Sequence, residues 1–196
     1  VHKSVINVMI LCGAIPVYIN AEVNNRIGIM LGITKEQVEE AILAHPRAVA
    51  VLVNNPTYYG ICSDIKGICE LAHSYGLKVL ADEAHGTHLY FGNNLPISGI
   101  AAGADMAAVS MHKSGGSLTQ SSILLTNNGM NADYVRTIIN LTQTTSASYL
   151  LMASLDISRR NLALRGRQSF QKVMEWAEYA REEINSIGGY YAYGKE

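Results

Sequence analysis

Two short polar segments of this 196-residue chain combine side chains that can carry out acid–base and nucleophilic chemistry. Residues 82–88 read Asp-Glu-Ala-His-Gly-Thr-His, and residues 110–116 read Ser-Met-His-Lys-Ser-Gly-Gly. A carboxylate, imidazoles, hydroxyls and a lysine together are a composition typical of active sites. Each segment follows an apolar run that we interpret as a strand. We therefore expect both segments to meet at the carboxyl edge of one sheet.

Two familiar interpretations of the first segment leave residues unexplained. The Asp-Glu-Ala-His stretch at 82–85 matches the helicase box, but nucleotide hydrolysis needs a phosphate loop of the form G-x-x-x-x-G-K-[ST], which the sequence lacks. Carboxylate and imidazole ligands from Asp82, His85 and His88 suit zinc or iron. A metal site of this kind gives Lys113 no role.

A carbonyl cofactor gives every group a role. Pyridoxal phosphate needs a lysine to hold its aldehyde as an imine, a carboxylate to keep its pyridine nitrogen protonated, and hydroxyl or imidazole donors for its phosphate. Lys113 and Asp82 are the candidates for the first two tasks. Hydrolysis by Ser110 with His112 is the weaker interpretation, because these residues lack the glycine-flanked elbow of the hydrolases.

The composition limits the class of protein. The formal charge is −1, 48% of residues are apolar and 16% are charged, which excludes a disordered tail and a basic nucleic-acid module. The apolar stretch 5–19 is interrupted by Asn7, Gly13 and Pro16 and is too short for a membrane span. Three cysteines without metal-ligand spacing favour a reducing compartment. We expect a cytoplasmic protein that binds neither nucleic acid nor membrane.

Short apolar runs alternate with amphipathic segments, which predicts an α/β domain with a mainly parallel sheet in a three-layer α/β/α arrangement. A capping box at Thr34 and an N-cap at Ser63 or Asp64 each predict the start of a helix. The uninterrupted apolar run 48–53 predicts a strand that is buried on both faces. Further strands are predicted at 77–81, 106–109 and 122–125, and C-terminal helices from residue 131, the last at 168–187.

Four motifs, taken together, resemble the Orn/Lys/Arg decarboxylase family, whose members are fold-type-I pyridoxal-phosphate enzymes of the aspartate aminotransferase superfamily. The resemblance runs from His2-Lys3-Ser4 to about Gly166. It implies that residues 1–166 are the core of a large cofactor-binding domain and that 167–196 form a helix leading out of it. The motifs are Asp82-Glu-Ala-His-Gly-x-His88, Ser110-x-His-Lys113 with Leu118-Thr-Gln120, Asn55-Pro-Thr-Tyr-Tyr-Gly60, and the run from Gln143 to Asp156.

The resemblance also implies a reaction and its main residues. A basic amino acid (arginine, lysine or ornithine) would be decarboxylated to an amine, as in polyamine biosynthesis, by a homodimer or a higher homo-oligomer. Lys113 would form the imine with pyridoxal 5'-phosphate, and Asp82 would pair with its pyridinium nitrogen. His2 would stack on the ring, and His85 would lie near the ring hydroxyl or the substrate.

Further family positions concern the phosphate and the edge of the site. Ser110 and His112 would bind the phosphate, and Asn55 and Thr57 would line the same edge. The pair Gly115-Gly116, where many relatives carry bulkier residues, predicts a loose loop after the lysine.

Two other outcomes stay open. The same scaffold supports other reactions of the cofactor, such as amino transfer. The family's phosphate-binding loop is expected to precede Val1, and its C-terminal domain to follow Glu196, so the chain is also interpreted as a fragment of the large domain without catalytic competence.

Overall fold

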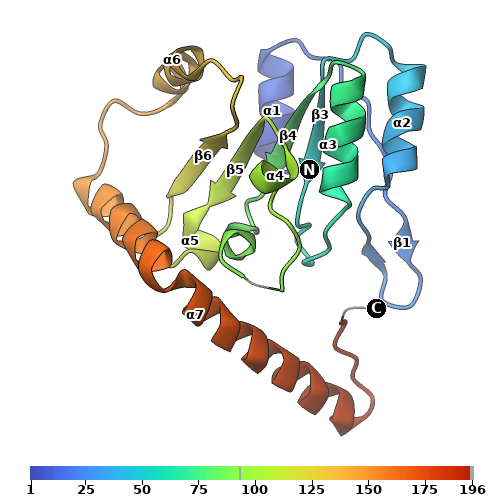
Figure 1. Ribbon diagram of the computed structural model, residues 1–196, viewed down its shortest axis with the longest axis vertical. Coiled ribbons are helices and arrows are strands. Elements are labelled where there is room, and N and C mark those ends of the chain that lie inside the picture. Colours follow the sequence, from blue (N-terminus) through green and yellow to red (C-terminus); the bar gives the residue numbers. More distant parts are fainter. Residues whose placement is uncertain (93, 195–196) are drawn as a thin grey trace.

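A four-stranded sheet forms the centre of the computed structural model, which describes residues 1–92 and 94–194 (Figure 1). The strand order is β3-β4-β5-β6, with β3, β4 and β5 parallel and β6 antiparallel to β5. This mainly parallel α/β arrangement confirms the predicted fold class. The strands are β3 (Ala50–Asn54), β4 (Lys78–Asp82), β5 (Met106–Ser110) and β6 (Ser122–Thr126), and a separate antiparallel pair consists of β1 (Val23–Asn24) and β2 (Ile29–Met30).

The helices begin where the sequence offers capping side chains. Thr34 and Gln37 form the predicted capping box, and the Asp64 side chain accepts a hydrogen bond from the backbone N–H of Gly67. These bonds satisfy N–H groups that the first helical turn leaves unpaired. The helices are α1 (Lys3–Leu11), α2 (Lys35–Ala44), α3 (Ile65–Ser74), the 3-10 helix η1 (Thr87–Tyr90), α4 (Gly99–Ala102), α5 (Met111–Ser114), α6 (Ala132–Thr142) and α7 (Tyr149–Ile187).

The main core lies between the sheet and helices α2 and α3. Strand residues alternate between the two faces, so Val53 and Val79 are buried against Ile68 of α3, with 1% or less of each side chain exposed. The expectation that the run 48–53 is buried on both faces is wrong. Val49 is 80% exposed and Leu52 only half-buried, because α2 and α3 cover one face of β3.

Helix α7 begins earlier than predicted. It is one helix of 39 residues from Tyr149 to Ile187, so the predicted start at Gln168 is wrong. Gly166 lies inside this helix, and its missing side chain lets another segment approach: a Cβ there would lie 2.8 Å from Cδ1 of Phe91. The division of the chain after residue 166 falls inside α7 and stays a prediction.

The inner part of α7 covers the second, smaller core. Leu162 is buried beside Val109 and Met111, and Phe170 packs against the same cluster. Beyond Phe170 the helix runs away from the sheet (Figure 1). Val173 is 48% exposed and Ile187 is 69% exposed, so apolar side chains of this outer part of α7 are left uncovered.

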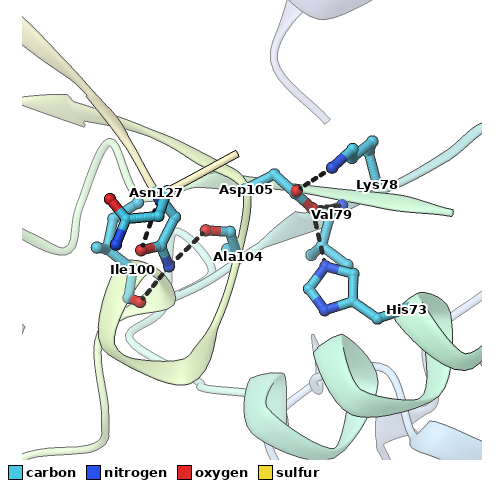
Figure 2. A network of polar contacts seen from close by, with 8 residues as sticks. His73, Lys78, Val79, Ile100, Ala104, Asp105 and Asn127 are labelled. Atoms are coloured by element: carbon cyan, nitrogen blue, oxygen red, sulfur yellow. Dashed lines mark hydrogen bonds and ion pairs between the residues drawn. The ribbon is translucent and has the colours of Figure 1, made fainter. Parts of the chain in front are cut away.

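A polar network ties the amino ends of β4 and β5 to α3 (Figure 2). The Asp105 carboxylate accepts hydrogen bonds from Lys78 Nζ at 2.7 Å, from the Val79 backbone N–H at 2.8 Å and from His73 Nε2 at 2.9 Å. Burial opposes ionisation of this carboxylate, but the three donors outweigh it and lower its pKa to about 2. The network fixes the end of the sheet that lies opposite the candidate site.

No helix in the described ranges is both long and apolar enough to cross a membrane.

Candidate active site

The carboxyl ends of β3, β4 and β5 lie level with one another. Asn54 is in register with Asp82, and Asp82 with Ala108. The ladder continues one residue further, because the Asn55 N–H donates to the Asp82 carbonyl and the Glu83 N–H to the Ala108 carbonyl, both at 2.9 Å. This alignment brings the polar segments that follow the strands to one edge of the sheet, as predicted.

Lys113 and His85 meet at this edge. Helix α5 starts directly after β5 and carries Lys113, whose Nζ lies 3.1 Å from Nε2 of His85. The Tyr58 ring packs edge-on against the imidazole of His85, with 5.3 Å between ring centroids. Partial burial lowers the pKa of His85, the Lys113 charge lowers it further, and the Asp82 charge opposes both effects. The imidazole therefore lies within electrostatic reach of both the amine and the carboxylate.

Asp82 is half-buried at the last position of β4. Its Oδ1 accepts a hydrogen bond from the Ala84 backbone N–H at 3.1 Å. That bond orients the carboxylate while leaving lone pairs on both oxygens for a further donor.

Asn55 carries an unpaired donor. Its side chain is fully buried, and its Oδ1 accepts from the Ser63 N–H at 2.8 Å. Its Nδ2 has no hydrogen-bond partner in the part of the chain that the structure describes. A buried amide donor without a partner is costly, which makes Nδ2 a candidate for contact with a bound molecule. Thr57, in contrast, uses its hydroxyl locally, since Oγ1 accepts from the Ile61 N–H at 3.2 Å.

His112 and Ser110, which precede Lys113, are held through different groups. Nδ1 of His112 donates to the Ser121 carbonyl at 2.9 Å, which fixes a proton on that nitrogen. Ser110 occupies the N-cap of α5 without a side-chain capping bond, and its carbonyl accepts from the Thr87 hydroxyl at 3.4 Å.

His2 lies at the start of α1. It caps α1, and its Nδ1 bonds to Ser4. Within the described residues it has no hydrogen bond or ring contact with any other candidate residue. Its predicted role in stacking therefore stays a prediction.

Glu83 has a structural role that the sequence showed only in outline. Strand alternation places it on the buried face, next to Asp82 but pointing away from it. Its carboxylate accepts from the Tyr90 hydroxyl and, at 2.8 Å, from the Gly99 N–H. Burial raises the pKa of Glu83 although both hydrogen bonds favour the charged form. Glu83 therefore helps to pack the sheet, and nothing in the sequence pointed to Tyr90 and Gly99 as its partners.

Other side chains and a cavity surround the cluster of Lys113, His85 and Asp82. Among residues 1–92 and 94–194, no three His, Cys, Asp or Glu side chains gather as a metal site would require. His88 stacks obliquely near Phe170 of α7, 6.1 Å away, and burial lowers its pKa. A cavity of about 630 Å³ lies between α7 and the loop after Lys113, lined in part by Ser114 and Arg165. It is separate from the cluster of Lys113, His85 and Asp82.

Known decarboxylases resemble this chain in sequence and in fold. The chain is 52% identical over its whole length to an arginine decarboxylase of Halalkalibacterium halodurans and 48% identical to one of Bacillus subtilis, and it spans about 40% of the length of each. Escherichia coli constitutive lysine decarboxylase shares the fold with a TM-score of 0.79 and 23% identity, over 97% of this chain and 29% of that chain. The family model for the major domain of Orn/Lys/Arg decarboxylases matches residues 1–193. The chain therefore belongs to the Orn/Lys/Arg decarboxylase family, as part of its major domain.

Proposed function

We propose that this chain carries the lysine and aspartate of a pyridoxal-phosphate enzyme that decarboxylates a basic amino acid to an amine. The observation that carries the proposal is the contact between Lys113 Nζ and His85 Nε2, 3.1 Å apart, beside the Asp82 carboxylate. Family membership and the shared fold support the same cofactor. Because the similar relatives are named arginine decarboxylases, arginine is the first substrate to test.

The residues present fit this cofactor. Its chemistry, when bound, is to accept the electron pair that the departing carboxyl group leaves behind. Lys113 offers the amine that holds the aldehyde and later returns a proton. Asp82 offers a carboxylate that holds a proton on the ring nitrogen, and without that proton the ring accepts electrons poorly. The unpaired Nδ2 of Asn55 is a donor for an oxygen of the ring.

Ser110 and His112 are the proposed phosphate ligands. His112 already donates through Nδ1 to the Ser121 carbonyl, which leaves its second nitrogen, Nε2, to face the phosphate. Thr57 and His2 complete the proposed edge, with His2 as the residue that stacks on the ring.

Assembly as a homodimer, a cytoplasmic location and a place in polyamine biosynthesis belong to the same proposal. Helix α7 leaves Leu150, Leu164 and Trp176 each about 70% exposed. Exposed apolar side chains of this kind suit burial against another chain or domain. Sedimentation at several concentrations tests the dimer.

Titration of the full chain with pyridoxal phosphate, followed by borohydride reduction and peptide mapping, tests the proposal. We expect saturable label on Lys113, lost in Lys113→Ala and kept in the control Lys66→Ala, which removes an exposed lysine of α3. A well-folded chain that takes no label at Lys113 contradicts the cofactor assignment.

Product analysis separates decarboxylation from amino transfer on a labelled chain. Arginine, lysine and ornithine are supplied in turn, and an amine with CO2 is expected. A keto acid in its place identifies an aminotransferase. We expect Asp82→Asn to keep the label on Lys113 but to lose most of the turnover.

A further inference from the structure

Helix α5, which carries Lys113, is too short to be stable by itself. It has four residues, Met111–Ser114, and the bond from the Gly115 N–H to the Met111 carbonyl, at 2.9 Å, closes its single turn. One turn of helix is unstable without outside contacts. The position of Lys113 therefore depends on what holds the segment that follows it.

That segment is tightly constrained, although its two glycines predicted a loose loop. A Cβ on Gly115 would lie 2.6 Å from the Met111 carbonyl oxygen, so only glycine fits against α5. Gly116 has φ +85° and Gln120 has φ 58°, both in the left-handed region. The Ser121 hydroxyl donates to the Leu118 carbonyl at 2.7 Å and closes the loop on itself.

Helix α7 holds this loop from outside through two serines one turn apart. The Ser158 hydroxyl donates to the Gly115 carbonyl at 2.5 Å, and Ser158 is 4% exposed. The Ser154 hydroxyl accepts from the Leu118 N–H at 2.8 Å. Residues four apart on a helix share one face, so a single face of α7 meets both ends of the loop. A helical serine usually bonds back to its own helix, whereas Ser158 bonds to the segment after the lysine.

We propose that Ser158, assisted by Ser154, is a positioning residue that fixes the loop 115–118 and so holds the Lys113 amine against His85. The hydrogen-bonded geometry stands without any cofactor, while its consequence for chemistry rests on the proposed function. Loss of the Ser158 hydroxyl frees the Gly115 carbonyl, loosens the end of α5 and lets the amine leave the imidazole.

Two cofactor-independent measurements on the full chain test this proposal. In Ser158→Ala we expect amide hydrogen exchange at Gly115 and Leu118 to accelerate about fivefold, the effect of losing one hydrogen bond. We also expect the NMR titration midpoint of His85 to rise, because the Lys113 charge that lowers it moves away. The control Ser169→Ala removes an exposed hydroxyl of the same helix and should change neither. Ser154→Ala is expected to accelerate exchange at Leu118, and it carries the test if Ser158→Ala does not fold.

Unchanged exchange at both amides together with an unchanged His85 midpoint overturns the proposal. Acceleration that extends equally to the amides of β3 and β4 also overturns it, since it would mean general loosening. Pyridoxal-phosphate labelling of Lys113 is measured in parallel, and a slower labelling rate in Ser158→Ala is expected. If the unaltered chain takes no label while exchange and titration behave as expected, the positioning role stands and the proposed function fails.

Discussion

The Lys113 Nζ and the Nε2 of the His85 imidazole lie 3.1 Å apart. Two groups that can both be cations are therefore held together at the edge of the sheet. Partial burial and the Lys113 charge both disfavour the charged form of the His85 imidazole, and Asp82 relieves this only in part. A neutral imidazole can accept a proton from a neighbouring amine.

This relationship predicts opposite shifts of the His85 pKa in two variants. Lys113→Met should raise the NMR titration midpoint of His85 towards the ordinary value of 6.5, because it removes a cation. Asp82→Asn should lower the midpoint further, because it removes an anion. Lys66→Met, on the exposed side of α3, serves as the control. Equal midpoints in all the variants would show that the imidazole does not sense this site.

The lowered pKa of His85 also determines how the free energy of unfolding changes with pH. The pKa of His85 is lower in the folded chain than in the unfolded chain, so the unfolded chain binds the extra proton first. This histidine therefore opposes folding as the pH falls below about 6.5. Above that pH the imidazole is neutral in both the folded and the unfolded chain, so its ionisation does not change the free energy of unfolding.

Asp105 should make the chain acid-sensitive at much lower pH. Its pKa falls from 3.8 to about 2 on folding, so its contribution is complete above pH 4 and is lost as the pH falls towards 2. The shift corresponds to about 2 kcal/mol. We expect Asp105→Asn to lower the free energy of unfolding by about that amount at pH 7 and to remove the loss between pH 4 and 2.

Urea denaturation at a series of pH values measures the effect. Asp133→Asn is the matched control, because Asp133 is 94% exposed and its partner Arg136 lies 3.9 Å away. An exposed pair of this kind contributes little. If Asp105→Asn and Asp133→Asn cost the same, the hydrogen bonds of Asp105 with Lys78, Val79 and His73 do not stabilise the fold.

Sequence patterns predicted the features that depend on residues close together in the chain. The capping box at Thr34, the strand ends before Asp82 and Ser110 and the placing of Lys113 just past a strand all depend on short-range periodicity and turn chemistry. The long-range contacts could not be predicted in this way. Gly166 lies against Phe91, which is 75 positions away in the chain, and only the folded chain shows that they touch.

The same difference between local patterns and long-range contacts applies to the candidate site. The sequence predicted that Lys113, His85 and Asp82 share one edge, since parallel strands bring their carboxyl ends together. It did not predict that Ser158 holds the loop after Lys113, because an isolated serine in a helix carries no signal of its partner. The flexibility expected from Gly115 was also wrong, since that glycine is required by close contact with Met111.

The burial pattern of the strands predicts unequal costs for the same substitution. Val79 is fully buried in β4, whereas Val49, just before β3, is 80% exposed. Val79→Ala should lower the free energy of unfolding by about 2 kcal/mol, through lost burial and a cavity. Val49→Ala should change it by less than about 0.5 kcal/mol. Urea denaturation compares the two, and equal costs would contradict the assigned core.

The contact between Gly166 and Phe91 predicts a substitution whose effect changes sign. Replacing a helical glycine by alanine normally stabilises by about 1 kcal/mol. In this chain the new Cβ would lie 2.8 Å from Cδ1 and 3.2 Å from Cβ of Phe91, so the ring must move and the Phe91–Phe170 stacking is disturbed. We expect Gly166→Ala to be destabilising, because overpacking costs about 1–3 kcal/mol and outweighs the gain.

A double-mutant cycle with Phe91→Ala separates the two effects. Once the ring is removed, Gly166→Ala should become stabilising by up to about 1 kcal/mol, because only the helix propensity remains. Thermal or urea unfolding of the four chains gives the coupling energy directly. If Gly166→Ala stabilises the chain while Phe91 is in place, α7 does not pack closely on Phe91. The contacts of Ser154 and Ser158 with the loop after Lys113 would then be what holds α7 beside the site.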